Sequence, residues 1–293
     1  METATEPSPA IRPAAIGIIA VGGEDAATFL QAQLSNDVLG LDTGRSRLAA
    51  WCDAKGRVQA VVRVLHRDDE FLMLLPRTLI PAVLQRLRLF VLRARVTLRD
   101  AGDDLVGYGL IDEPAEGTTP APGEVAADGQ RQYLGLPGPA PRRIAIGPPR
   151  ALADMTPADD DAWRRAGILA GEPQVYPETQ GLFVPQMLNL HWLDGIDFHK
   201  GCYPGQEVVA RLQYRGKLTR RLFRAHLPAG RTPPPAAAVV DEAGETRGQV
   251  ADAAPGPDGQ DLLAVLRIDA ADKPLYIDGA ELTLAQLPYP TGE

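Results

Sequence analysis

The sequence predicts an α+β protein that ends in a small all-β barrel, and three observations predict it. Apolar residues at positions 58, 60, 62 and 64 alternate with mainly polar ones, which is typical of a β-strand. Helical segments separate such strands, and this order favours helices on one face of an antiparallel sheet. After Lys217 short apolar runs alternate with glycine and proline turns, which favours a barrel.

The first elements are expected to be short. Residues 1–13 contain three prolines and few apolar side chains, so they are predicted to form a disordered tail. A strand should begin at Ile16. A helix capped by Glu24 or Asp25 should then run to about Leu34.

A β-hairpin and a second helix follow. Residues 47–52 and 58–64 flank the turn Asp53–Gly56, and a third strand is expected at 71–75. Pro81 suits the first turn of the helix after it. Returning strands are expected at residues 96–98 and 106–111.

The middle of the chain is less regular. Residues 112–142 are rich in Pro, Gly, Ala and acids, so they are expected to form an exposed excursion. Aspartates should cap a helix over residues 159–169, whereas residues 170–193 are too irregular for a long element. Further short strands are expected at residues 144–146, 218–223, 239–240, 248–251, 262–268 and 282–284.

Composition and charge indicate a cytoplasmic globular protein. The net charge of −8 argues against nonspecific nucleic-acid binding by the whole surface. The acidic N-terminus lacks the basic region of a signal peptide, and no apolar run approaches the ~20 residues that span a bilayer, so no membrane partner is expected. Cys52 and Cys202 should therefore be free thiols. The four histidines show no metal-ligand spacing, so no metal site is predicted.

One turn carries an unusual cysteine. The string K-G-C-Y-P-G-Q-E spans residues 200–207, and its glycines and proline require a tight turn. Such a turn would lift the thiol of Cys202 out of the fold. His199, Lys200 and the start of a helix at Gln206 would favour its thiolate form.

This string resembles the signature of the YgfZ family, folate-binding proteins that are related in fold to the T protein of the glycine cleavage system. Residues 29–38, 52–57 and 287–289 also resemble family segments, in the family's order. The resemblance implies a three-domain cloverleaf. Residues 14–45 and 143–214 would form a split first domain that carries the signature, residues 46–142 an inserted ferredoxin-like α+β domain, and residues 215–293 the barrel.

The resemblance also implies a function. Family members support iron–sulfur enzymes, including tRNA-thiolating ones. The protein is accordingly expected to bind folate, to assist iron–sulfur client enzymes or assembly proteins, and to use Cys202 as a reactive thiol aided by Lys200 and Glu207. Lys200 and Glu207 each also have a purely structural alternative. Glu207, for example, is spaced to pair with Arg211 along one face of a helix.

Trp163 is the main candidate for a folate contact, because it resembles a family tryptophan associated with the ligand and an indole stacks on flat rings. A core tryptophan on an amphipathic helix fits the same pattern. Gln186 and Asn189 carry amides suited to a pterin edge, or to capping turns. The remaining candidate contacts are Tyr203, Gln206 and Arg211.

Two rival functions remain. A tetrahydrofolate-dependent one-carbon transferase needs a carboxylate near its folate, whereas no acidic residue lies between Gly56 and Asp68. Whether any reaction is catalysed is left open. The second rival binds tRNA directly through a run of basic residues that begins at Arg211, although such a run also suits a solvated linker. Iron–sulfur clusters usually take four thiolates, so two cysteines indicate no intrinsic cluster, while Cys202 remains a candidate ligand of a shared one.

Overall fold

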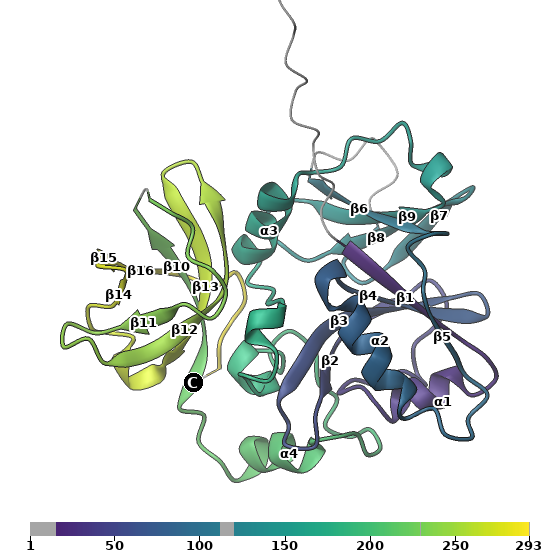
Figure 1. Ribbon diagram of the computed structural model, residues 1–293, viewed down its shortest axis with the longest axis horizontal. Coiled ribbons are helices and arrows are strands. Elements are labelled where there is room, and N and C mark those ends of the chain that lie inside the picture. Colours follow the sequence, from purple (N-terminus) through teal and green to yellow (C-terminus); the bar gives the residue numbers. More distant parts are fainter. Residues whose placement is uncertain (1–15, 112–119, 229, 293) are drawn as a thin grey trace, which may run out of the picture.

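One antiparallel sheet extends through the first half of the protein. The computed structural model describes residues 16–111, 120–228 and 230–292, and within them nine strands form this sheet. Its order is β2-β3-β4-β1-β6-β9-β8-β7, and β5 pairs with β1 (Figure 1). The strands are β1 (Ile16–Gly22), β2 (Ser46–Cys52), β3 (Val58–Arg67), β4 (Glu70–Pro76), β5 (Thr97–Asp100), β6 (Val106–Ile111), β7 (Val125–Asp128), β8 (Arg131–Leu136) and β9 (Arg142–Gly147).

The predicted hairpin is formed by β2 and β3. Asp53 closes its turn, because the Asp53 carboxylate accepts hydrogen bonds from the main-chain N–H groups of Lys55 and Arg57, both at 2.9 Å. Gly56 takes a φ of 70°, which favours glycine. Two polar residues in the middle of β3 do not face solvent: Gln59 and Arg63 are each only 8% exposed. Both faces of β3 are therefore covered.

Four α-helices lie among the described residues: α1 (Ala26–Gln31), α2 (Ile80–Arg88), α3 (Asp160–Leu169) and α4 (Gln206–Tyr214). The predicted helix to Leu34 is too long. Leu34 instead bridges to Trp51, and Ser35 donates its N–H to Ala50, so the chain leaves α1 to join β2. Asp159 caps α3 as predicted, because its carboxylate accepts from the Ala162 N–H at 2.7 Å.

The exposed excursion predicted over residues 112–142 is wrong for its second half. Strands β7 and β8 form a hairpin that joins the sheet beside β9, and Tyr133 and Leu134 are buried there. Apolar burial outweighed the local richness in glycine and proline. Residues 112–119 and the predicted N-terminal tail at 1–13 lie outside the described residues.

The predicted C-terminal barrel is confirmed. Its strands follow the order β15-β14-β11-β12-β13-β10-β16 around a separate apolar core, and in Figure 1 it lies to the left of the large sheet. The strands are β10 (Arg220–Leu227), β11 (Ala238–Val240), β12 (Thr246–Gly256), β13 (Gly259–Arg267), β14 (Tyr276–Ile277), β15 (Ala280–Glu281) and β16 (Thr283–Ala285).

The large sheet crosses two predicted domain boundaries. Strand β1, placed in the split domain, pairs with β4, β5 and β6, and β9 pairs with β6 and β8. The boundaries at residues 45 and 143 thus fall within one hydrogen-bonded layer, and they stay predictions. No helix in the described part of the chain is long and apolar enough to cross a membrane.

Candidate functional site

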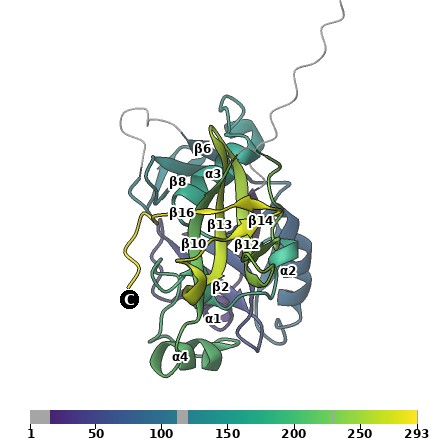
Figure 2. The same cartoon turned by 90° about the vertical axis from the view of Figure 1, so that its left-hand side faces the viewer.

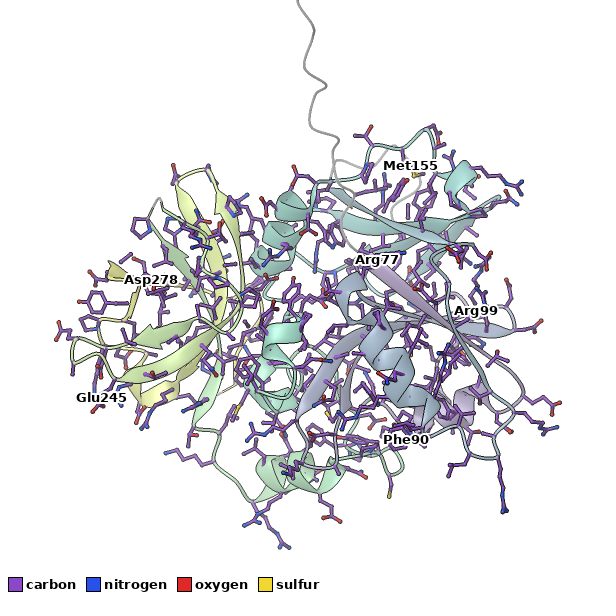
Figure 3. The ribbon with its side chains drawn as sticks, in the orientation of Figure 1. Arg77, Phe90, Arg99, Met155, Glu245 and Asp278 are labelled. Atoms are coloured by element: carbon purple, nitrogen blue, oxygen red, sulfur yellow. The ribbon has the colours of Figure 1, made fainter. Side chains whose placement is uncertain are left out.

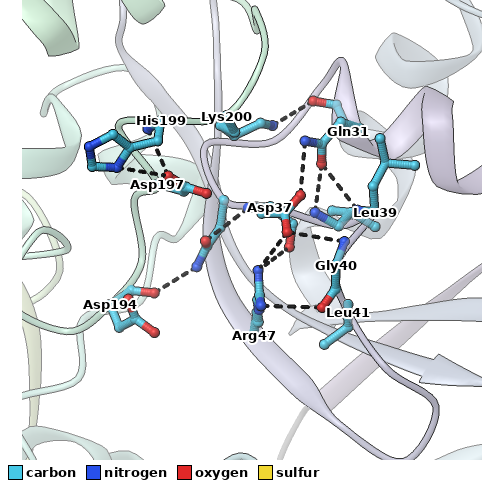
Figure 4. Close-up of polar contacts among 12 residues, drawn as sticks. Gln31, Asp37, Leu39, Gly40, Leu41, Arg47, Asp194, Asp197, His199 and Lys200 are labelled. Carbon is cyan, nitrogen blue, oxygen red and sulfur yellow. Dashed lines mark hydrogen bonds and ion pairs between the residues drawn. The ribbon is translucent and has the colours of Figure 1, made fainter.

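Hydrogen bonds near the end of α1 connect two of the family-like segments, residues 29–38 and the chain that leads into the cysteine turn at residues 200–207. The Lys200 ammonium donates to the main-chain oxygens of Gln31 and Leu34, at the end of α1 (Figure 4). Ser35 accepts from the Asp197 N–H at 3.0 Å and donates its hydroxyl to Gly195 O at 2.7 Å. Residues 29–38 therefore position the chain that leads into the cysteine turn.

A third family-like segment, residues 52–57, contacts the cysteine turn through Gly56 and Gly205. Gly205 has a φ of 79°, and a Cβ there would lie 2.4 Å from Gly56 Cα and 2.5 Å from Asp53 O. Only a residue without a side chain permits this approach. The β2–β3 turn and the K-G-C-Y-P-G-Q-E turn are consequently in backbone contact.

The cysteine turn exposes one side chain and buries the next. Cys202 is exposed, as predicted, and Tyr203 is buried beside it. Burial is the main cause that raises the pKa of Tyr203 above its usual value, and it lowers the pKa of Lys200 to about 8. The Lys200 ammonium lies 5.2 Å from the centre of the Tyr203 ring. Tyr203 and Lys200 thus anchor the turn while the thiol stays outside.

Helix α4 begins directly after the cysteine turn, at Gln206. Gln206 is half-buried, and Glu207 and Arg211 are exposed. The predicted Glu207–Arg211 pair is wrong, since neither residue forms an ion pair within the described chain. An exposed pair at this spacing contributes only a few tenths of a kcal/mol, so solvent competes with it effectively.

A separate cavity of about 350 Å³ lies where the sheet, α3 and the barrel meet. Trp163 reaches it from α3, and the half-buried indole packs against Gly109 of β6. A Cβ at Gly109 would lie 2.4 Å from Trp163 Cε3, so the glycine makes room for the ring. The Arg142 guanidinium stands 5.9 Å from the indole centre. The side chains that line this cavity include Arg63, Arg77, Arg142, Trp163, Arg164, Glu172, Gln174, Tyr176 and Asp252.

A buried ion cluster forms one wall of the cavity. Arg63 Nη2 lies 3.0 Å from Glu172 Oε1, and Arg142 binds the other carboxylate oxygen. Burial by itself would raise the pKa of Glu172, but the charges of Arg63 and Arg142 outweigh it and lower this pKa to about 2. Glu172 therefore stays ionised and fixes two arginines from different strands.

A second buried carboxylate joins the barrel to α3. Arg164 Nε donates to Asp252 Oδ1 at 3.0 Å, and the Tyr176 hydroxyl donates to Oδ2 at 2.8 Å. Burial raises the pKa of Asp252 although Arg164 opposes this effect. Both oxygens of Asp252 are thus engaged in holding the wall of the cavity.

One polar atom at the cavity has no partner. Gln174 Oε1 is buried and accepts no hydrogen bond from the described residues. A buried acceptor without a donor is costly and is commonly satisfied by a ligand or a water molecule. Gln174 Oε1 is therefore available to accept a hydrogen bond at this cavity.

The other predicted contacts lie elsewhere. Gln186 donates to Val209 O at 2.7 Å, and Asn189 exchanges hydrogen bonds with the main chain of Leu222 at 3.0 and 3.3 Å. Both amides fasten segments that are distant in sequence, so these bonds are not the predicted turn caps, and neither residue lines the Trp163 cavity.

Cys202 and Trp163 are not brought together. Cys202 does not line the Trp163 cavity, and Figures 1 and 2 both place α3 in the upper half of the molecule and α4 at its lower end. The signature turn and the cavity are two separate features. Within the described residues, no cluster of His, Cys, Asp and Glu has the arrangement of a metal site.

Sequence reasoning missed the charged wall of the cavity. Arg63 lies between Val62 and Val64 in a strand rich in valine, and Glu172 lies between a glycine and a proline in a segment with few charges. An isolated charge within an apolar stretch was the available signal, because such a charge is rarely buried without a partner. The partners themselves come from distant strands, so their identity required the structure.

Comparison with known proteins fits this architecture. "tRNA-modifying protein YgfZ" of Serratia proteamaculans (strain 568) is 30% identical over 300 residues, which cover 94% of this chain and 91% of that protein. The protein of the same name from Sodalis glossinidius is 33% identical, with coverage of 94% and 91%. This chain belongs to the YgfZ family. A YgfZ protein of Colwellia psychrerythraea is 35% identical over 71% of this chain and 68% of its own length.

Two further matches concern the fold of this YgfZ family member. Residues 219–289 match the family of the CAF17 C-terminal β-barrel domain. The crystal structure of glycine cleavage system aminomethyltransferase T from Bartonella henselae superposes with a TM-score of 0.75 at 15% identity, covering 94% of this chain and 84% of that one. The predicted relationship to the T-protein fold is confirmed.

Proposed function

We propose that this protein binds a folate in the Trp163 cavity and serves as an accessory factor for an iron–sulfur enzyme that modifies tRNA. The names of its YgfZ relatives support the link to tRNA modification. The cavity supports the ligand, and the exposed cysteine turn supports contact with a client enzyme.

The observation that carries the folate proposal is the Trp163 indole beside an unpaired buried acceptor. A flat aromatic ligand can stack on the indole, and Gln174 Oε1 can accept a hydrogen bond from an N–H group of a pterin. Arg77 is exposed at the cavity and pairs with no carboxylate of the described chain, so it can bind the glutamate carboxylates of folate. A bound reduced folate would supply one-carbon or redox chemistry through its pteridine ring.

Calorimetric titration with 5-formyltetrahydrofolate and folic acid tests this proposal. Trp163→Ala should weaken binding about tenfold, because it removes the stacking surface. Trp192→Phe, outside the cavity wall, is the matched control and should bind as the native protein does. Absence of binding by the native protein, or native affinity in Trp163→Ala, would overturn the proposal.

We do not propose a one-carbon transfer of the T-protein type. Glu172 is held by Arg63 and Arg142, and Asp252 by Arg164 and Tyr176, so neither of the two buried carboxylates at the cavity is free to act as a base. An aminomethyl-transfer assay with tetrahydrofolate should give no turnover above background. Robust turnover would replace the accessory role with an enzymatic one.

The proposed reactive group is the Cys202 thiol. It is exposed on a turn that Lys200 and Gly205 hold in place, and Glu207 lies in the first turn of the helix that follows. Cys202→Ser should abolish support of iron–sulfur enzymes in a strain that lacks this protein, with unfolding unchanged. Full complementation by Cys202→Ser would remove the thiol from the proposal.

Direct tRNA binding is a second candidate. Arg211, Arg215 and Lys217 are exposed after the cysteine turn, and Lys55 is exposed on the adjoining β2–β3 turn. None of these four residues pairs with a carboxylate of the described chain. Tyr214, 66% exposed, offers a stacking surface among them.

A filter-binding titration against tRNA tests the second candidate. The affinity should fall steeply with salt, and an Arg211→Gln, Arg215→Gln, Lys217→Gln variant should lose most of it and show a shallower salt slope. Arg45→Gln, a single exposed change on the large sheet's side of the molecule, is the control. Equal affinity in the triple variant would exclude this surface.

A further inference from the structure

The turn that follows α2 exposes large apolar side chains. Leu89 is 71% exposed, Phe90 45% and Leu92 86%. Seven large hydrophobic side chains are exposed in the described chain, and these three lie within four consecutive positions. Scattered exposed leucines are ordinary, whereas a cluster marks an interaction surface.

The residues of α2 that pack in the core all precede this turn. Helix α2 buries Ile80, Val83, Leu84 and Leu87. The helical turn then continues irregularly, with Phe90 N–H donating to Leu87 O at 3.0 Å. Val91 turns back to pack against the core, and its three apolar neighbours face outward. Core packing therefore does not explain the identity of Leu89, Phe90 and Leu92.

Uncompensated positive charge surrounds the same residues. No acidic residue occurs between Glu70 and Asp100, a stretch that holds six arginines. Arg95 pairs with Glu24 and Asp25, and Arg99 with Glu70 and Asp104. Arg86 and Arg88 donate only to the neutral oxygens of Gln59 and Leu98, and neither they nor Arg93 pair with a carboxylate of the described chain. The whole chain carries −8, so the remainder outside this stretch carries −8 − 6 = −14. The positive charge is local.

We propose that these residues form a docking surface for an acidic amphipathic helix of a partner protein. The surface, called here the α2 patch, consists of Leu89, Phe90 and Leu92 with Arg86, Arg88 and Arg93. The apolar face of the helix would cover the leucines and the phenylalanine, and its carboxylates would reach the arginines. The patch goes beyond the proposed folate site, because Arg77 and Phe90 lie at opposite ends of α2 (Figure 3).

Charge selects this occupant over two others. A two-fold symmetric dimer through this surface would place two sets of unpaired arginines against each other. An anionic bilayer would attract the patch but repel the −14 carried by the residues outside 71–99. A single acidic helix would contact only the α2 patch, so the acidic remainder of the protein would not face it.

Fluorescence anisotropy with designed peptides tests the proposal. The probe is a labelled peptide of about 18 residues, with leucines spaced i, i+3, i+4 and i+7 and glutamates elsewhere. The full-length protein should bind it, and raising the salt from about 0.05 to 0.5 M should weaken binding at least tenfold. Leu89→Ser with Leu92→Ser should weaken binding about tenfold or more, as should Arg88→Gln with Arg93→Gln.

Controls separate the outcomes. Ile268→Ser, at a 39% exposed apolar residue on the barrel, should leave binding unchanged. All the changed side chains are exposed, so thermal unfolding should match the native protein. Equal binding of a lysine-for-glutamate peptide would overturn the proposal. So would binding to phosphatidylserine vesicles in place of the peptide, patch-dependent dimerisation, or no binding at all.

Discussion

Glu172 holds together two arginines that come from different strands of the sheet. Glu172→Gln would leave Arg63 and Arg142 buried without a counter-charge, because both guanidinium groups are nearly inaccessible to solvent. We expect a loss of about 3–5 kcal/mol in the free energy of unfolding, measured with urea. Glu178→Gln, an exposed change at the same cavity, should cost less than about 0.5 kcal/mol.

The same substitution should change the response to acid. The pKa of Glu172 falls from an ordinary 4.5 to about 2 on folding, so its ionised form stabilises the native state above pH 4.5. This contribution is lost as pH falls from about 4.5 toward 2. The native protein should therefore lose more stability over this range than Glu172→Gln does. Parallel curves for the two proteins would contradict the ion cluster.

The two cysteines should differ in reactivity. Cys202 is exposed, whereas Cys52 is buried at the end of β2 and burial raises its pKa well above the ordinary value. Titration with a thiol-specific reagent should label one thiol rapidly in the native protein and the second only after unfolding. Rapid labelling of Cys202→Ser would contradict the burial of Cys52.

At the scale of the elements, the contact between the two turns depends on Gly205. Gly205→Ala would place a methyl group against the backbone of Gly56 and Asp53 at a left-handed φ, so we expect a loss of about 2–4 kcal/mol. Gly201→Ala is the matched control, because a Cβ at Gly201 meets no atom within 4 Å. It should stay within about 0.5 kcal/mol of the native protein in the same urea titration. Equal stability of the two variants would mean that the turns do not press on each other.

Most elements could be predicted because their local signals agreed. The alternation in β3, the aspartates before α3 and the glycine before α4 each gave the correct type of element. The end of α1 could not be predicted, because the bridge between Leu34 and the distant Trp51 takes the chain out of the helix. Strand β8 was also missed, because its place beside β9 is a long-range pairing within a stretch of turn-forming composition.

The candidate site was predictable only in part. Cys202 and Trp163 could be singled out from the residues and from the family resemblance, and the structure exposes one thiol and places the indole at a cavity. Their separation could not be foreseen, because residues 170–205 link the two features by an irregular path. Asn189 misled for a physical reason: a buried amide that binds the main chain has the same sequence appearance as one that binds a ligand.

At the scale of the whole molecule, α3 carries the docking of the barrel. Arg164 pairs with the buried Asp252, and Arg165 pairs with the more accessible Asp261 at 2.7 Å. Asp252→Asn should therefore cost about 3 kcal/mol and speed amide exchange in α3 and β12. Asp261→Asn should cost less than about 1 kcal/mol, because solvent screens this pair.

The terminal family-like segment supports the same contact. The Tyr289 hydroxyl donates to Gly171 O at 2.9 Å, next to the loop that carries Glu172. A Cβ at Gly171 would lie 2.6 Å from the Tyr289 ring, so chain end and loop are in close contact. Barrel, α3 and the charged wall thus form one continuous structure around the cavity. Equal costs for the changes at Asp252 and Asp261 would contradict the deeper burial of the Arg164–Asp252 pair.

Fluorine NMR of the 5-fluorotryptophan-labelled protein tests the central claim most directly, because the chain has three tryptophans: Trp51, Trp163 and Trp192. Trp51 is buried in the core and Trp192 lies outside the cavity wall, so only Trp163 can meet a ligand in the cavity. Titration with 5-formyltetrahydrofolate should shift the signal that is missing from Trp163→Phe and leave the other two in place. A bound folate that leaves the Trp163 signal unmoved would contradict the account.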